Sequence, residues 1–164
     1  MAKSAKSSPK SDAISLSEGR KAPDFTLKDD TGETVKLSGL TGRKVVLYFY
    51  PKDDTPGCTK EACSFRDGFK EIQKMGAIVL GVSPDSVESH RKFKEKFHLN
   101  FPLLSDEGKK VVNAYGVWKE KSLYGRKYMG VERTTFVIDE GGKIKKVFPK
   151  VKVDGHYEEV IAEL

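Results

Sequence analysis

The sequence predicts an α/β fold with a mixed central sheet flanked by helices. Two apolar runs, residues 45–50 and 77–83, have the composition of buried strands. An amphipathic helical pattern follows each run, and a β-hairpin pattern precedes a last helix at the carboxyl end. Strands that alternate with helices and then pair in a hairpin combine parallel and antiparallel strands in one sheet.

Length and composition indicate one domain. The 164 residues suffice for a single core, and the 33% charged and 37% hydrophobic residues are typical of soluble globular proteins. We expect a disordered tail over residues 1–17, which is rich in Ser, Lys and Ala, and one domain over residues 18–164. The net charge of +6 comes from interspersed Lys and Glu, which argues against a nucleic-acid partner. No apolar run reaches the roughly 18 residues of a membrane helix, so we expect no membrane partner.

The amino half is expected to alternate strands with helices, each bounded by turn residues or a helix cap. In chain order, the pattern first predicts a hairpin, in which an extended segment at 22–27 pairs with 33–37 around a turn at 29–32. The strand 45–50 follows, and then one helix from Pro56 to about Met75. The strand 77–83 comes next, and after it a helix that is capped by residues 83–86 and continues to about Phe97.

The carboxyl half begins with a short strand at 101–105 and a helix capped by Asp106. From Gly116 to Gly130 the apolar pattern is weak, and we expect a long exposed loop of the kind that often carries function. The remaining elements are a strand at 134–138, its antiparallel partner at 143–148, and a final helix that begins near Tyr157.

Cys58 is the candidate nucleophile. Pro51 and the Pro56-Gly57 pair interrupt the preceding strand, and Thr55 followed by proline predicts a helix N-cap. Cys58 then falls in the first turn, where free N–H groups and the helix dipole favour an anion such as a thiolate. A lone cysteine is more often a small buried hydrophobe, but the strand, loop and capped helix around this one favour reactivity.

Cys63 follows Cys58 by five residues, a spacing that differs from the C-x-x-C motif of dithiol oxidoreductases and zinc knuckles. On an intact helix the two Cα atoms are about 8–9 Å apart and face different sides, whereas a disulfide needs them within about 7 Å. The two thiols can therefore bond only after local unwinding, which suits a switch. Packing of Cys63 in the core is the alternative.

A cation near the thiol is expected from Arg133, which precedes an apolar strand and can stay charged there. The alternative is an ordinary solvent-exposed arginine at a strand end. The three histidines, His90, His98 and His156, are expected at the surface, and no Cys or His spacing suggests a metal site.

These residues resemble a known family. Pro51, Thr55 and Cys58 match the active-site signature of peroxiredoxins, and Arg133 with the following strand looks like the segment that carries their active-site arginine. The second cysteine at position 63, together with the runs 115–118 and 124–125, is similar to the peroxiredoxin Q group, also called bacterioferritin comigratory protein. The resemblance extends from about Gly19 to the end of the chain and includes every signature position.

The resemblance implies a thioredoxin-like fold with an N-terminal β-hairpin extension, and reduction of hydroperoxides without cofactor, metal or haem. It implies that Cys58 becomes a sulfenic acid and then forms a disulfide with Cys63, and that thioredoxin recycles the enzyme. Arg133 would stabilise the thiolate and the leaving oxygen, Thr55 would align the peroxide, and Pro51 would shape the pocket. A monomer in the cytoplasm is expected.

Three other functions are alternatives to a peroxidase. The chain could be a thiol-disulfide exchange protein that acts through Cys58 and Cys63, although the lack of C-x-x-C counts against it. It could be a non-enzymatic redox sensor, which only turnover distinguishes from an enzyme. It could also be a basic binding module whose cysteines are structural, in which case both thiols would react slowly with an alkylating reagent.

Overall fold

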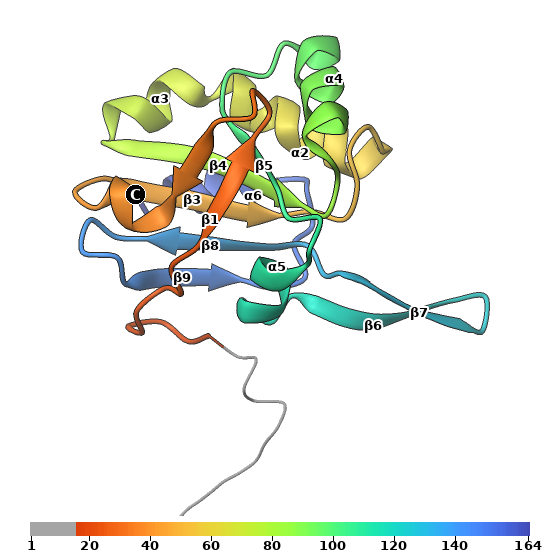
Figure 1. The fold of residues 1–164 in the computed structure, drawn as a ribbon. Helices are drawn as coiled ribbons and strands as arrows, with labels where there is room; N and C mark the ends of the chain where they lie inside the picture. The colour runs from red at the N-terminus through yellow and green to blue at the C-terminus, as the bar shows by residue number, and fades with distance from the viewer. Residues whose placement is uncertain (1–15) are drawn as a thin grey trace, which may run out of the picture.

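A computed structural model describes residues 16–164, so the predicted tail over residues 1–17 lies outside the described residues except for its last two positions. Seven strands form one sheet in the order β2-β1-β5-β4-β3-β8-β9 (Figure 1). They are β1 (Thr26–Asp29), β2 (Thr34–Lys36), β3 (Lys44–Phe49), β4 (Ala77–Ser83), β5 (Leu103–Ser105), β8 (Thr134–Ile138) and β9 (Ile144–Phe148).

Five α-helices and one 3-10 helix accompany the sheet among the described residues. They are η1 (Leu37–Leu40), α2 (Pro56–Asp67), α3 (Phe69–Lys74), α4 (Val87–Phe97), α5 (Lys110–Ala114) and α6 (His156–Ile161). Strand β4 runs parallel to β3 and to β5, whereas β8 and β9 are antiparallel to their neighbours. The hairpin β1–β2 joins the sheet at β5. The mixed sheet and the N-terminal hairpin confirm the predicted fold class.

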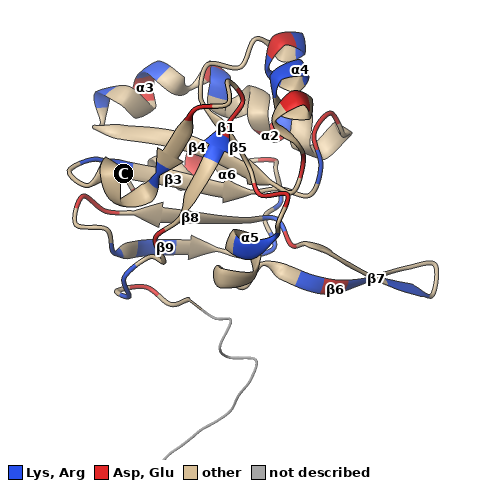
Figure 2. Ribbon diagram, in the orientation of Figure 1, with Lys and Arg blue, Asp and Glu red and all other residues tan. Residues whose placement is uncertain are grey.

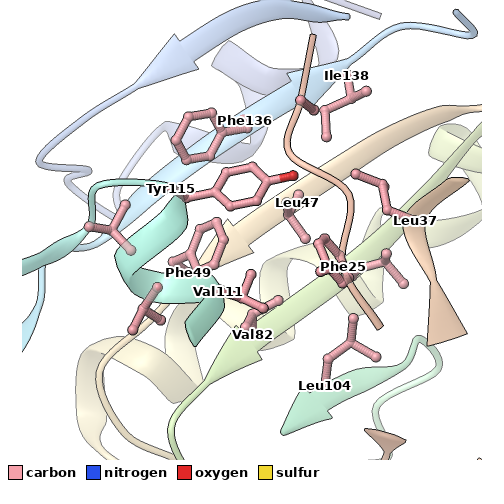
Figure 3. Close-up of a cluster of buried hydrophobic side chains, with 14 of the residues drawn as sticks. Phe25, Leu37, Leu47, Phe49, Val82, Leu104, Val111, Tyr115, Phe136 and Ile138 are labelled. Carbon is pink, nitrogen blue, oxygen red and sulfur yellow. The ribbon is translucent and has the colours of Figure 1, made fainter. Parts of the chain in front are cut away.

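Strand β3 separates two cores because its side chains alternate between the faces of the sheet. Leu47 and Phe49 belong to one cluster, where Figure 3 shows them beside Tyr115 and Phe136. Tyr48 and its neighbours on the opposite face join a second cluster with residues of α2, α3, α4 and α6. Cys58 is part of this second cluster, so the candidate nucleophile is built into the core rather than added to the surface.

The helix predicted from Pro56 to about Met75 is wrong in its continuity, because it breaks at Gly68 into α2 and α3. A Cβ atom at Gly68 would overlap the ring of Tyr157, whose hydroxyl donates to the Gly68 carbonyl at 3.2 Å. The break therefore marks the place where α6 packs against the α2–α3 junction. Nothing in the local apolar spacing signals this contact, since its partner is 89 residues away.

The long loop predicted from Gly116 to Gly130 is also wrong. This segment forms a two-stranded hairpin of β6 (Trp118–Leu123) and β7 (Arg126–Val131), which projects from the body of the molecule (Figure 1). The connecting residues Tyr124 and Gly125 both have positive φ, 52° and 77°, as a tight hairpin turn requires. Because the hairpin is largely exposed, it needs no alternation of apolar residues, and the sequence pattern missed it.

The helix predicted to be capped by Asp106 begins later than expected. Helix α5 begins at Lys110, four residues after the predicted cap Asp106, whose carboxylate accepts a hydrogen bond from the backbone N–H of Val112 at 2.8 Å. Basic and acidic residues are interspersed over α3 and α4, whereas α5 and the β6–β7 hairpin are mainly basic (Figure 2). The described helices include none that is long and apolar enough to span a membrane.

Candidate active site

Cys58 lies in the first turn of α2, where its side chain is buried with 1% exposed. Asp54 turns the chain with a φ of 58°, Thr55 is the N-cap, and Pro56 begins the helix. The Thr55 hydroxyl does not cap the helix, because it donates instead to the carbonyl of Lys52 at 2.9 Å. Its oxygen keeps lone pairs with which it can accept a hydrogen bond.

Arg133 reaches the thiol from the segment between β7 and β8. Its Nη2 donates to Cys58 Sγ at 3.3 Å, and its Nη1 donates to Glu61 Oε1 at 2.7 Å. Burial alone would lower the pKa of Arg133, but the charges of Glu61 and Cys58 raise it above its ordinary value. A Cβ atom at Gly57 would meet Nη2 at 3.1 Å, so the absence of a side chain there leaves room for the guanidinium.

Glu61 is the functional residue that the sequence analysis missed. It lies one turn after Cys58 on α2, and only 1% of the residue is exposed. Burial raises the pKa of Glu61 to about 7, although the Arg133 guanidinium opposes the shift. Glu61 Oε2 and the Tyr48 hydroxyl are buried without a hydrogen-bond partner in the described part of the chain. The i, i+3 spacing from Cys58 was the available signal for Glu61.

The other predicted residues lie at the edge of this arrangement or away from it. Pro51 is half-buried at the end of β3, and Cys63 is half-buried on α2. Cys63 lines a cavity of about 620 Å³ between α2 and α6, whose other lining residues include Lys60, Glu71 and Tyr157. Both cysteines are free thiols. The structure therefore brings Cys58 and Arg133 together and leaves Cys63 on an intact helix, outside their contact.

The prediction that all three histidines lie at the surface is wrong for two of them. His90 and His156 have 0% and 1% of their surface exposed, whereas His98 is exposed as predicted. His156 Nε2 lies 2.8 Å from the Thr135 hydroxyl, and burial lowers the pKa of His156. A buried histidine has few sequence signals of its own, because its partner is usually distant in the chain.

Lys121 is a second basic residue near the site, from strand β6. Burial lowers the pKa of Lys121, the positive charge of Arg133 lowers it further, and the Cys58 charge opposes both. No sequence pattern places Lys121 at the site, because residues 116–130 were predicted to form a loop.

A buried thiol at a helix N-terminus beside a charged guanidinium is the environment of a nucleophilic cysteine, and on a mixed sheet flanked by helices it fits a thiol-dependent redox enzyme. The model of the AhpC/TSA family matches residues 19–147. The chain belongs to this family, and it is a peroxiredoxin, a peroxidase that works through cysteine.

Its relatives place it in the Bcp or peroxiredoxin Q group. It is 52% identical over 151 residues to peroxiredoxin Bcp of Bacillus subtilis, covering 92% of this chain and 96% of that protein. It is 47% identical over 146 residues to peroxiredoxin Bcp of Escherichia coli, covering 89% of this chain and 94% of that protein. A thioredoxin-like fold is common to this group and to the present chain.

A solved structure agrees with this assignment. Trapped intermediate and ligand complex structures of bacterioferritin comigratory protein from Xanthomonas campestris concern the alkyl peroxide reduction activity of that protein. The matching chain is 40% identical with a TM-score of 0.83, and the match covers 89% of this chain and 96% of that one.

Proposed function

We propose that Cys58 is the thiol that reduces the peroxide. The observation that carries this proposal is the 3.3 Å contact between Cys58 Sγ and Arg133 Nη2 in the first turn of α2. A guanidinium and free helical N–H groups favour the thiolate, which is the nucleophilic form of cysteine. Within residues 16–164, Cys63 has no hydrogen bond from a cation like that of Cys58, which supports Cys58 rather than Cys63 as the first nucleophile.

In the first step, the Cys58 thiolate attacks one oxygen of a hydroperoxide ROOH. An S–O bond forms, the O–O bond breaks, and the departing alkoxide takes up a proton to give ROH, which leaves Cys58 as a sulfenic acid. Arg133 stabilises the charge that moves from sulfur to the leaving oxygen. Thr55 accepts a hydrogen bond from the peroxide, and Pro51 borders the pocket without a donor of its own.

In the second step, the Cys63 thiol attacks the sulfur of the sulfenic acid, and water leaves as the disulfide forms. Because Cys63 lies five residues along the same helix, this step requires the first turns of α2 to unwind. A dithiol reductant, which we propose to be thioredoxin, then restores both thiols by exchange. The cycle is complete in one chain, so the proposed enzyme is a monomer, and we propose the reducing cytoplasm as its place.

Both hydrogen peroxide and organic hydroperoxides are proposed as substrates. To test the roles of the two cysteines, the reduced protein would be mixed with one equivalent of hydrogen peroxide in a stopped-flow instrument and analysed by intact mass. We expect the wild type to become two hydrogens lighter, Cys63→Ser to consume the equivalent and stop as sulfenic acid, and Cys58→Ser to react no faster than free cysteine.

Repeated additions of peroxide with thioredoxin and its reductase distinguish an enzyme from a sensor, because only an enzyme turns over. A dithiol that reduces the disulfide much faster than thioredoxin would replace thioredoxin as the proposed partner. Equal loss of the first equivalent in Cys58→Ser and Cys63→Ser would contradict the division of roles.

A further inference from the structure

A largely buried polar cluster forms hydrogen bonds with the loop that joins β3 to α2. It consists of Tyr50, Asp53, Asp85, Ser89 and His90, and we call it the loop anchor. His90 comes from α4 and has 0% of its surface exposed, and Asp53 comes from the loop itself and has 7% exposed. The peroxidase chemistry derived above uses none of these residues.

Two short contacts engage both ring nitrogens of His90. Its Nε2 lies 2.9 Å from the backbone carbonyl of Leu104, and because a carbonyl only accepts, Nε2 must carry a proton. Its Nδ1 lies 2.7 Å from Asp53 Oδ2. A proton on Nδ1 makes His90 an imidazolium and Asp53 a carboxylate, which compensate each other's charge in a buried site.

Asp53 is held by further donors. The Tyr50 hydroxyl donates to Oδ1 at 2.6 Å, and the Ser89 hydroxyl donates to Oδ2 at 2.8 Å. The backbone N–H of Asp53 donates to Asp85 Oδ2 at 2.8 Å. Asp53, Asp85 and His90 are close enough to hold a metal ion, but donors of the protein already occupy these carboxylates. The cluster is therefore better explained as a fixed point for the backbone than as a metal site.

This fixed point is five residues from the thiol. Asp54, the next residue, has a φ of 58° and turns the chain, and α2 begins two residues later at Pro56. Any shift of Asp53 is thus passed through a short, strained turn to the first turn of α2. A displacement of about 1 Å at a reacting group can lower a rate about a hundredfold.

We propose that His90 and Asp53 form a buried ion pair that positions Cys58 for its attack on the peroxide. His90 makes no contact with the thiol and acts through Asp53, so it is a positioning residue. The proposal rests on the proposed role of Cys58. Two apolar residues in place of His90 and Asp53 could give the protein similar stability. They would not hold the backbone of residue 53 and the turn at Asp54 through hydrogen bonds.

The charge on His90 can be tested directly in the reduced, full-length protein. Long-range ¹H–¹⁵N NMR at neutral pH should show His90 with a proton on both ring nitrogens, as in an imidazolium, while exposed His98 serves as the internal comparison. A spectrum of a neutral ring with one protonated nitrogen would overturn the ion pair. This result does not depend on which cysteine reacts with peroxide.

The positioning role is tested with Asp53→Asn, which removes the charge but keeps an oxygen for Tyr50. The matched control is Asp54→Asn, because asparagine adopts the positive φ of this position and, among the described residues, the variant loses only the exposed ion pair with Lys96 at 2.8 Å. We expect Asp53→Asn to slow the peroxide step about tenfold per folded molecule. Formation of the Cys58–Cys63 disulfide, followed by quenched-flow mass analysis, should not slow.

A purely stabilising pair would lower the melting temperature and leave both rates unchanged, and that outcome would overturn the proposal. If Asp53→Asn does not fold, His90→Gln takes its place, because it removes the charge and keeps a donor to Asp53. Residual peroxide reactivity in Cys58→Ser would contradict the proposed function instead, which separates the two failures.

Discussion

Glu61 has the most unusual ionisation among the side chains of the site. Burial raises its pKa from 4.5 to about 7, in spite of the nearby Arg133 guanidinium. A carboxyl group that binds its proton more tightly in the folded chain contributes its full stabilisation below about pH 4.5 and loses it as the pH rises through about 7. The wild type should therefore lose about 3 kcal/mol of unfolding free energy across this window from Glu61 alone.

Glu61→Gln should remove this loss, because glutamine does not ionise and its oxygen can still accept from Arg133. Relative to wild type, the variant should gain up to about 3 kcal/mol between pH 4.5 and pH 7. Urea unfolding of the reduced proteins at several pH values measures the difference. Glu88→Gln on the exposed side of α4 is the control, and a Glu61→Gln difference independent of pH would show that the carboxyl titrates like an exposed one.

At the scale of single residues, the sequence predicted the positions of those side chains whose surroundings are set by residues nearby in the chain. The place of Cys58 in a first helical turn was predicted from the cap and proline before it, and the place of Arg133 from the strand after it, whereas their catalytic roles stay predictions. His90 was missed because its partners, Asp53 and the Leu104 carbonyl, come from other elements. The protonation of Glu61 is likewise set by burial and by a residue 72 positions away.

At the scale of elements, the break between α2 and α3 is fixed by α6. The Tyr157 ring occupies the space of a side chain at Gly68, so Gly68→Ala must displace it. We expect Gly68→Ala to lower the free energy of unfolding by about 1–3 kcal/mol. Gly108→Ala, at a position with nothing within 4 Å of the added carbon, is the control.

The same substitution in a Tyr157→Ala protein tests whether the Tyr157 ring causes the loss of stability. In a Tyr157→Ala protein the ring is absent, and Gly68→Ala should then cost nothing or stabilise, since alanine favours helix by about 1 kcal/mol over glycine. Chemical denaturation of the four proteins completes a double-mutant cycle. An equal cost of Gly68→Ala in both backgrounds would place the cause in the backbone of Gly68 rather than in the contact with Tyr157.

The sequence predicted elements where one face is buried and failed where that signal is missing. Strands β3 and β4 were recognised because nearly all their side chains lie in the core. The β6–β7 hairpin was missed because it is exposed on both faces at its tip, where the only local signal is the Tyr124-Gly125 turn. Exposed hairpins are defined by backbone pairing, which leaves little trace in hydrophobic periodicity.

At the scale of the whole molecule, the sheet and helix α2 have different parts in the proposed cycle. Strands β3 and β8 lie in the interior of the sheet, and nearly all their side chains are buried. Helix α2 packs Ala62 and Phe65 into the second core, while at its surface Lys60 pairs with Asp154, and exposed ion pairs of this kind contribute little. The buried contact of Arg133 with Glu61 holds the turn that carries Cys58.

The spacing of the two cysteines on α2 predicts where the oxidised protein opens. A Cys58–Cys63 disulfide cannot form on an intact helix, so oxidation by one equivalent of hydrogen peroxide should unwind the first turns of α2 and leave the sheet in place. Hydrogen exchange followed by mass spectrometry should show loss of protection confined to α2 and the segments that touch it, with β3 and β4 unchanged. Cys63→Ser, treated in the same way, cannot form the disulfide and should keep its protection. Oxidised wild type with full protection over residues 58–63 would mean that the disulfide forms between chains, which a covalent dimer mass of twice 18.3 kDa would reveal.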